Sequence, residues 1–258
     1  MDIKQLYKQG NKLILLIKGT DPAFVNTLRR IMVSELPTMA IRRVTFVKNN
    51  SALFDEILAH RLGLLPLITD LSTYELSEKC SCKGAGCAKC QLVITLKAEG
   101  PLTVYASDLK FQDPKIKSVH AKIPIIKLLK GQELEFEAVA TLGTGREHAK
   151  FIPGLVFYRG YPDFIIEKKT GVKPAMQECN GLLKEKGEKL EVTDFSKWNE
   201  SYEEVCENNG IKIENSEKDF IFTIESWGKL APEEIISKSL DVLDEKLDEF
   251  AAQLSKAK

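Results

Sequence analysis

Two features are missing from this sequence: a long apolar run and an excess of charge of one sign. No stretch of about 18 consecutive apolar residues occurs, so we expect no transmembrane helix. Basic and acidic side chains number 37 each, which gives the chain no overall electrostatic reason to bind nucleic acid or membrane tightly. The opening residues, MDIKQLYKQGNK, lack the apolar core of a secretory signal. We therefore expect a cytoplasmic protein.

Cysteine is also scarce, with six among 258 residues. In a cytoplasmic chain, a small set of thiols suggests metal or redox chemistry before it suggests a disulfide framework. The apolar fraction of 43% and the charged fraction of 29% predict a folded protein. The length suits one large domain or two to three small ones.

The first strong pattern is an amphipathic helix over residues 21–36. Asp21 is a good N-cap, and Pro22 suits the first helical position because its missing N–H would have no partner there. Pro37 ends the helix, since the residue before a proline is pushed out of the helical region. The apolar positions recur at helical spacing and are Phe24, Val25, Leu28, Ile31, Met32 and Leu36. Taken alone, this pattern indicates a core helix whose opposite face is solvated.

A second amphipathic helix is predicted at the end of the sequence. It follows a strand over residues 220–226 and begins at Pro232, with Glu233 and Glu234 favourably placed at the positive helix end. Its apolar residues repeat in alternating steps of three and four and are Ile236, Leu240, Leu243, Leu247, Phe250 and Leu254. So narrow a seam favours packing against one other helix, either of another chain or the first helix of its own domain.

Between these helices, the sequence predicts a strand and a shorter helix. Residues 38–49 read as a strand whose broken alternation indicates a bulge or a domain crossing. Residues 53–67 begin as a helix that Gly63 ends. Its predicted apolar side consists of Phe54, Ile57, Leu58 and Leu62. His60 on this helix is interpreted as an ordinary polar residue.

Residues 80–90, CSCKGAGCAKC, form the candidate metal site. Cys80, Cys82, Cys87 and Cys90 have the spacing C-x-C-x4-C-x2-C, and four thiolates on two short turns can surround Zn²⁺ tetrahedrally. Neighbouring lysines, Lys79 among them, would help to offset the negative charge. All-sulfur ligation would also suit iron, and reduced thiols or two disulfides in the loop are the alternatives without metal. A four-cysteine site is closed, so we expect a structural role and no catalysis.

The segment from 91 to 153 is predicted to be rich in strands. Residues 91–100 and 133–143 alternate apolar and polar side chains, residues 101–109 form another strand, and the apolar run within 118–129 is ambiguous. After a glycine turn at 143–145 come four polar residues: Arg146, Glu147, His148 and Lys150. On pattern alone they form a solvated loop, and His148 lacks the neighbours that catalysis would need.

Residues 161–216 have the order strand, helix, helix, strand, which indicates a ferredoxin-like insertion. The strands are predicted at 161–169 and 211–216. The helices are predicted at 171–186 and at 194–208, the latter capped by Asp194 or Ser196. The remaining cysteines, Cys179 and Cys206, lie here, and they either form one disulfide or stay free.

Four segments then agree, in order, with one known family: residues 26–41 (NTLRRIMVSELPTMAI), 53–67 (LFDEILAHRLGLLPL), 143–153 (GTGREHAKFIP) and 222–243 (FTIESWGKLAPEEIISKSLDVL). They resemble the dimerisation helix, the H-R-(I/L)-G helix ending, the G-x-x-x-x-H-A-K-W box and the terminal strand and helix of the assembly subunits of multisubunit RNA polymerases. Phe151 replaces the usual tryptophan of the box. The family includes bacterial alpha subunits with their eukaryotic and archaeal counterparts, and size and cysteine arrangement are most similar to the archaeal members.

The resemblance implies an α+β fold built as an RNA polymerase alpha-like dimerisation domain with two insertions. Residues 1–42 and 217–258 would form the dimerisation domain, 43–160 a β-rich insert domain with the cysteine loop, and 161–216 the ferredoxin-like insertion. Many archaeal relatives carry iron–sulfur clusters in that insertion, on a dense cysteine run. Cys179 and Cys206 are too few for a four-iron cluster, so we expect none.

The implied function is non-catalytic scaffolding within a nucleotidyltransferase complex. The chain would pair with subunit L and then recruit subunits N and P and the large catalytic subunits. The expected contacts with subunit L are Phe24, Leu28, Ile31, Met32, Leu240, Leu243, Leu247 and Phe250. The large subunits would dock on Arg146, Glu147, His148 and Lys150.

Two other function classes compete with this interpretation. A zinc-containing nucleic-acid-binding module would show salt-dependent DNA affinity, and the balanced charge argues against it. A metalloenzyme would need an open metal position with a histidine or carboxylate ligand, which the four cysteines do not provide.

Overall fold

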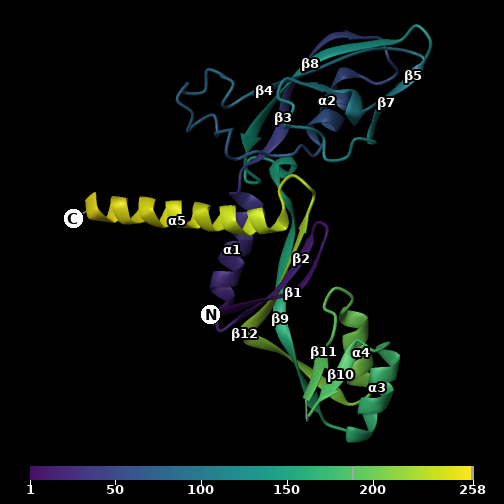
Figure 1. Ribbon diagram of the computed structural model, residues 1–258, viewed down its shortest axis with the longest axis vertical. Coiled ribbons are helices and arrows are strands. Elements are labelled where there is room, and N and C mark those ends of the chain that lie inside the picture. Colours follow the sequence, from purple (N-terminus) through teal and green to yellow (C-terminus); the bar gives the residue numbers. More distant parts are fainter. Residues whose placement is uncertain (188, 257–258) are drawn as a thin grey trace. The chain divides into compact units, whose positions relative to one another are not determined.

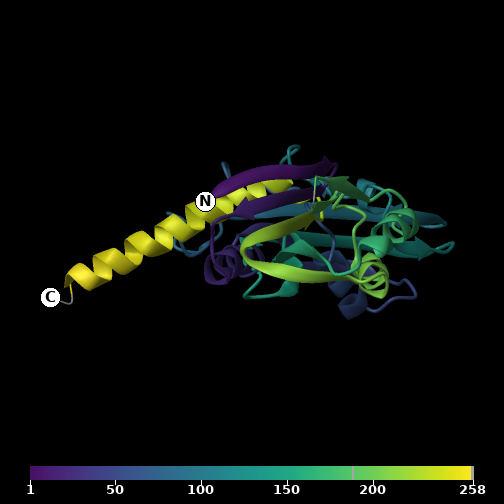
Figure 2. The same cartoon turned by 90° about the horizontal axis from the view of Figure 1, so that it is seen from below.

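The computed structural model describes residues 1–187 and 189–256 and divides into two compact units (Figures 1 and 2). Unit 1 combines residues 1–29 with 155–225, and unit 2 combines 30–154 with the chain from 226 onward. This division differs from the three predicted domains, because it groups the final helix with the β-rich segment. Among the described residues, no helix is long and apolar enough to cross a membrane.

Unit 1 is built on a four-stranded sheet with the order β1-β2-β12-β9. The strands are β1 (Asp2–Gln9), β2 (Lys12–Lys18), β9 (Gly154–Ile166) and β12 (Ile211–Ser226). β2 pairs antiparallel with both β1 and β12. Two strands predicted separately, at 211–216 and 220–226, are thus one continuous strand. The sheet draws together the beginning of the chain and a segment about 200 residues later, as in the bond from Gly19 N to Asp219 Oδ1 at 3.0 Å.

The first predicted helix is confirmed as α1 (Pro22–Ser34), which runs across the boundary between the two units. Asp21 Oδ1 accepts a hydrogen bond from Phe24 N at 2.8 Å. This is the N-cap that the sequence predicts. The helix ends three residues before Pro37, consistent with the proline stop.

The segment between β9 and β12 contains more strand than the sequence suggested. Its elements are α3 (Val172–Glu178), β10 (Leu183–Lys186), β11 (Lys189–Val192) and α4 (Glu200–Asn208). β10 and β11 form their own two-stranded sheet, apart from the four-stranded one. The ferredoxin-like arrangement is therefore not confirmed.

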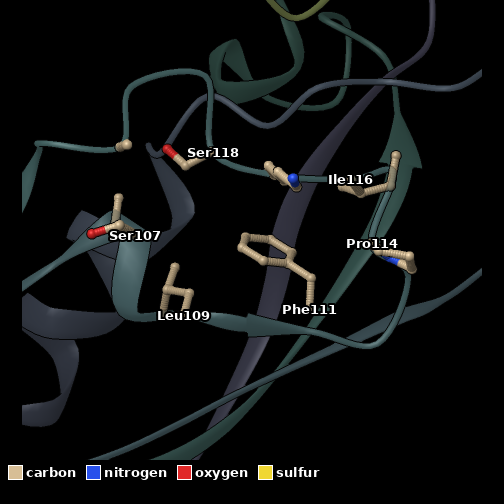
Figure 3. A pocket seen from close by; sticks show the side chains of 9 residues that line it. Ser107, Leu109, Phe111, Pro114, Ile116 and Ser118 are labelled. Carbon is tan, nitrogen blue, oxygen red and sulfur yellow. The ribbon is translucent and has the colours of Figure 1, made fainter.

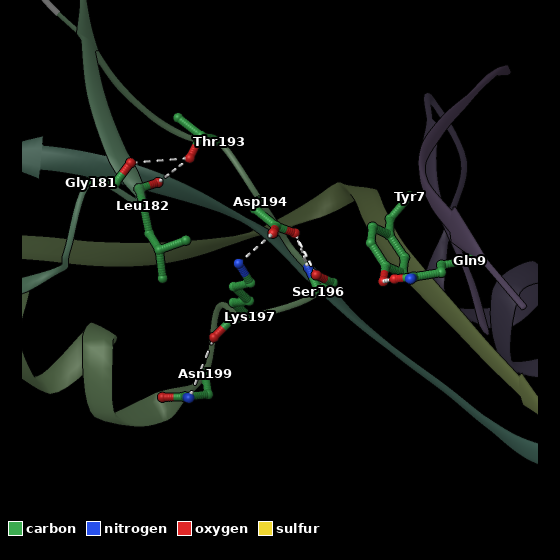
Figure 4. Close-up of polar contacts among 9 residues, drawn as sticks. All are labelled: Tyr7, Gln9, Gly181, Leu182, Thr193, Asp194, Ser196, Lys197 and Asn199. Carbon is green, nitrogen blue, oxygen red and sulfur yellow. Dashed lines mark hydrogen bonds and ion pairs between the residues drawn. The ribbon is translucent and has the colours of Figure 1, made fainter.

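Both helix predictions in this segment were too long. The helix predicted over 171–186 stops at Glu178, because Asn180 and Gly181 adopt positive φ angles of 51° and 77° that end a helix. The second helix begins only at Glu200, and its cap is Asn199, which accepts from Ser201 N at 3.0 Å. Asp194 instead accepts from the N–H and hydroxyl of Ser196 in a local turn, shown in Figure 4.

Unit 2 contains a second four-stranded sheet with the order β3-β8-β4-β6. Its strands are β3 (Thr38–Asn49), β8 (Glu133–Gly143), β4 (Leu92–Glu99) and β6 (Lys110–Phe111). A two-stranded ribbon of β5 (Leu102–Tyr105) and β7 (Pro124–Leu128) accompanies it. The apolar run left ambiguous by the sequence is thus the strand β7. β3 carries two bulges, between Ile41 and Arg43 and between Phe46 and Lys48, which explains its broken alternation.

Helix α2 (Asp55–Gly63) belongs to unit 2, and its apolar side is narrower than predicted. Leu58 and Leu62 are fully buried in the core, whereas Phe54 and Ile57 are 75% and 46% exposed. Phe54 precedes the helix as its N-cap residue, which removes it from the helical face.

The last helix is α5 (Pro232–Lys256). It begins at Pro232 as predicted, and Glu234 accepts from Ala231 N at 3.1 Å. In both views the C-terminal half of α5 extends away from the strands of its own unit (Figures 1 and 2).

Candidate functional site

The four cysteines of the predicted metal site lie together in unit 2. Their sulfur atoms are all within 4.8 Å of one another. The Sγ–Sγ distance is 3.5 Å for Cys80 and Cys87, 3.5 Å for Cys82 and Cys90, and 3.9 Å for Cys87 and Cys90. A tetrahedral metal with bonds of about 2.3 Å separates its sulfur ligands by about 3.8 Å. The sulfur positions therefore fit a four-coordinate metal ion, and all four cysteines are free thiols.

The local backbone brings these thiols together. Lys83 N donates to Cys80 O at 2.9 Å and Cys90 N donates to Cys87 O at 3.0 Å, so each half of the loop closes a tight turn. Gly84 and Gly86 have φ angles of 83° and 87°, which glycine adopts without a Cβ clash. The glycines between the cysteine pairs thus allow the two turns to face each other.

Hydrogen bonds between these thiols also shift their pKa values. The thiol of Cys90 hydrogen-bonds to Cys82 and lowers the pKa of Cys82 to about 6. A thiolate is the form that ligates a metal. Lys79 was expected to offset the charge of the loop, but its ammonium binds Glu245 Oε2 of α5 at 2.7 Å. That ion pair raises the pKa of Lys79.

Cys179 and Cys206 lie apart from this loop, in the core of the α3–α4 segment of unit 1. Both are fully buried free thiols. Burial raises the pKa of both thiols, to about 12 for Cys206. They act as small apolar core residues, and the structure favours the free state over the disulfide.

The seam predicted on α5 is largely exposed. Ile235 and Ser239 of this helix are fully buried, whereas Leu247, Phe250 and Leu254 are 57%, 64% and 54% exposed. Leu240 is exposed and Leu243 half-buried. Apolar side chains in a row on a protruding helix are typical of an interaction surface.

The residues proposed on α1 have a different environment. Leu28, Ile31 and Met32 are buried within the chain and Phe24 is half-buried. Of the predicted interface residues, Leu240, Leu247 and Phe250 of α5 are therefore exposed, whereas Leu28, Ile31 and Met32 of α1 are buried.

Of the four polar residues after β8, Arg146, Glu147 and His148 lie in a loop, as their pattern predicts, and Lys150 lies in the 3₁₀ turn that follows, η2 (Ala149–Phe151). Arg146 N donates to Ser34 O at 2.9 Å, and a Cβ on Gly145 would come within 2.0 Å of Val33 O. This close approach holds the loop against the end of α1. His148 Nδ1 accepts from Lys150 N at 3.0 Å and caps η2.

One buried charge was not predicted from the sequence. Lys229, in the turn before α5, is only 3% exposed, and its ammonium donates to the Lys150 carbonyl and to Thr38 Oγ1. Burial, and secondarily Lys150, lowers its pKa to about 8. A lone lysine in a turn motif gives no sequence signal of burial, because the segments around it come from distant parts of the chain.

A pocket of about 360 Å³ lies beside β6 in unit 2 (Figure 3). Leu109, Phe111 and Ile116 form its walls, with the hydroxyls of Ser107 and Ser118 at the rim. Its lining, as far as the described residues go, contains none of the predicted site residues and one ionisable side chain, Lys117.

Comparison with known proteins identifies relatives along the whole chain. Residues 44–153 match the RNA polymerase Rpb3/RpoA insert domain family. The DNA-directed RNA polymerase subunit Rpo3 of Methanosphaera stadtmanae is 37% identical, over 96% of each chain. The Rpo3 subunit of Methanosarcina acetivorans is 38% identical, over 98% of this chain and 97% of its own. That of Pyrococcus furiosus is 36% identical, over 99% of this chain and 98% of its own.

These matches cover both units and do not favour a zinc-containing nucleic-acid-binding module. They confirm the predicted resemblance at the level of the family, under the name Rpo3. The chain belongs to the Rpo3 family of archaeal DNA-directed RNA polymerase subunits.

Proposed function

We propose that this chain is a non-catalytic assembly subunit of a DNA-directed RNA polymerase, the archaeal counterpart of the bacterial alpha subunit. The observation that carries the proposal is the similarity to Rpo3 subunits over nearly the full length of both chains. Among the described residues, the one cluster of three or more metal-type ligands is made of four cysteines. Such a set leaves no open position for a substrate.

The proposed partner surface is the exposed seam of α5, which would pack against the smaller subunit L. Leu247 and Phe250 are more than half exposed. A partner helix that covered them would gain about 1.5–3 kcal/mol for each fully buried side chain. Lys79 pairs with Glu245 of α5, and Lys246 of α5 pairs with Glu35 of the same unit. These ion pairs support a fixed orientation of α5 before the partner binds.

The test is co-purification of the two subunits. We expect the double variant Leu243→Ala, Leu247→Ala to stay soluble but to recover much less subunit L, because each buried truncation costs about 2–5 kcal/mol. The matched control is Asp244→Ala with Asp248→Ala, one residue further along the same helix. Undiminished recovery of subunit L with the leucine variant would contradict the proposal.

We further propose that the cysteine loop binds Zn²⁺ as a structural ion, held by Cys80, Cys82, Cys87 and Cys90. The tetrahedral fit of the sulfur atoms supports this assignment, since zinc commonly occupies closed four-thiolate sites. When bound, the ion would cross-link the two turns of the cysteine loop and would take no part in a reaction. We propose no iron–sulfur cluster for the segment that contains Cys179 and Cys206.

The remaining proposals concern the other subunits and the domains. Residues 1–42 and 217–258 would act as the dimerisation domain, 43–160 as the insert domain and 161–216 as the ferredoxin-like insertion. The family match at 44–153 supports the second of these. Subunits N and P would join the pair, and the large catalytic subunits would dock at Arg146, Glu147, His148 and Lys150.

A further inference from the structure

A small pocket in unit 2, of about 110 Å³, gathers basic side chains from three separate segments. Arg42 comes from β3, His60 from α2, and His148 and Lys150 from the loop after β8. Within the part of the chain that the structure describes, no acidic residue lines it. We call it the α2–β3 pocket.

The β3 bulge explains how Arg42 reaches this pocket. Ile41 pairs with Ala140 and Arg43 pairs with Val139, so Arg42 is the extra residue without a partner on β8. A bulge re-aims a side chain out of the regular alternation. Arg42 therefore lines the pocket, whereas its neighbour Arg43 keeps its place in the ladder and does not.

The pocket has more positive charge than its surroundings neutralise. Glu147 Oε2 lies 3.1 Å from Arg42, and the Arg42 side chain is still 53% exposed. Lys150 Nζ donates to the Ile41 carbonyl at 2.9 Å, which is a neutral acceptor. Burial, with Arg42 next, lowers the pKa of Lys150. Among the ion pairs given for the described residues, only the pair with Glu147 involves these basic side chains.

His148 adds a directed donor to this set. Its Nδ1 accepts the Lys150 N–H, so the neutral ring carries its hydrogen on Nε2. That N–H remains available for an acceptor on a ligand.

Beside the pocket, α2 exposes two apolar side chains on the face that carries His60. Ile57, His60 and Leu64 follow one another at spacings of three and four, so they share one helix face. Ile57 is 46% exposed and Leu64, which also lines the pocket, is 52% exposed. A free inorganic anion would gain nothing from these apolar side chains, whereas a polypeptide would bury them.

We propose that the α2–β3 pocket binds a carboxylate side chain of a partner polypeptide, with Ile57 and Leu64 contacting apolar residues beside that carboxylate. The basic lining of the pocket selects an acidic residue. This inference rests on the proposed assembly function and specifies the chemistry of the docking surface around His148 and Lys150.

The experiment is affinity purification of the polymerase from cells that produce this chain with a tag. We expect Arg42→Glu to reduce recovery of one partner subunit by about tenfold, because it places like charges together. The matched control is Arg43→Glu, the same charge change on the adjacent residue, and it should recover the wild-type amount. His60→Glu, on an exposed helix position, provides a second variant should Arg42→Glu fail to fold.

A photo-crosslinker in place of Leu64 identifies the occupant directly. Mass spectrometry should find it joined to a peptide of a partner subunit that contains aspartate or glutamate close to the cross-link. A cross-linked segment without an acidic residue would overturn the proposal.

The remaining outcomes separate this inference from the assembly function. Recovery of no polymerase subunit with the wild-type chain would refute the assembly function itself. Equal recovery with Arg42→Glu and Arg43→Glu would refute only the carboxylate pocket. Calorimetric titration of the purified chain with inorganic phosphate completes the test. Saturable binding lost in Arg42→Glu, with subunit recovery unchanged, would identify a free-anion site and also overturn the proposal.

Discussion

Single residues show where this protein departs from simple patterning, and Lys229 is the clearest case. Its ammonium group is buried and donates hydrogen bonds to Thr38 Oγ1 and to the Lys150 carbonyl. The hydrogen bonds described for it include no carboxylate partner. Thr38 in turn donates to Phe151 O at 2.5 Å. This polar network joins β3, η2 and the turn before α5 within unit 2.

The lowered pKa of Lys229 predicts that the folded protein becomes more stable as the pH is raised. Its pKa falls from the ordinary 10.5 to about 8, so between these values the unfolded chain binds the proton and the folded chain releases it. Stability therefore rises with pH across this window, and the cost of burying the charge is fully present below about pH 8. That cost is on the order of 3 kcal/mol.

The measurement is urea denaturation at pH 7 and pH 10. We expect the free energy of unfolding of the wild type, relative to Lys229→Met, to increase by on the order of 2–3 kcal/mol between the two pH values. Lys127→Met, at an exposed lysine of β7, is the control and should leave the pH dependence unchanged. The same pH dependence in wild type and Lys229→Met would contradict the assignment.

At the scale of helices and strands, the sequence predicted the features that depend on residues close together in the chain. The Asp21 cap, the proline starts of α1 and α5, and the grouping of four cysteines within one short loop all follow from neighbours in sequence. The predicted helix over 171–186 failed for a local reason too. Asn180 and Gly181 carry the chain into a turn, and the residues after them pair as a hairpin.

The cysteine loop supports a prediction about metal content. Cys87→Ser should remove one of four ligands and reduce bound zinc from about one ion per chain to a small fraction, since a tetrahedral site loses its closure. Elemental analysis of the purified chain measures this, together with a count of reactive thiols. Cys179→Ser, in the buried core of the other unit, is the control and should keep its metal. Equal metal content in the two variants, or iron in place of zinc, would contradict the prediction.

At the scale of the whole molecule, the charge balance limits what the chain does alone. With 37 basic and 37 acidic side chains, the isolated subunit should not bind duplex DNA more tightly than ordinary non-specific contact, about 10⁻⁴–10⁻⁶ M at physiological salt. Fluorescence anisotropy with labelled duplex at increasing salt tests this. Tight binding with a steep salt dependence would revive the nucleic-acid-binding alternative.

The whole molecule also decides which apolar faces remain open. The family resemblance assigned apolar residues of both α1 and α5 to the contact with a partner subunit. The structure buries Leu28, Ile31 and Met32 of α1 and leaves Leu247 and Phe250 of α5 exposed. Helical periodicity reports which side chains share a face, but it does not report whether the rest of the chain covers that face.

The sequence by itself determined the family resemblance, the two main helices, most strands of the insert region and the metal-type cysteine loop. These depend on residue spacings within short segments, where backbone geometry and capping act directly. Only the tertiary structure decided the bulge that turns Arg42 into the α2–β3 pocket, the burial of Lys229 and the open seam of α5. Each of these depends on segments that lie far apart in the chain, and no local pattern encodes which distant surfaces meet.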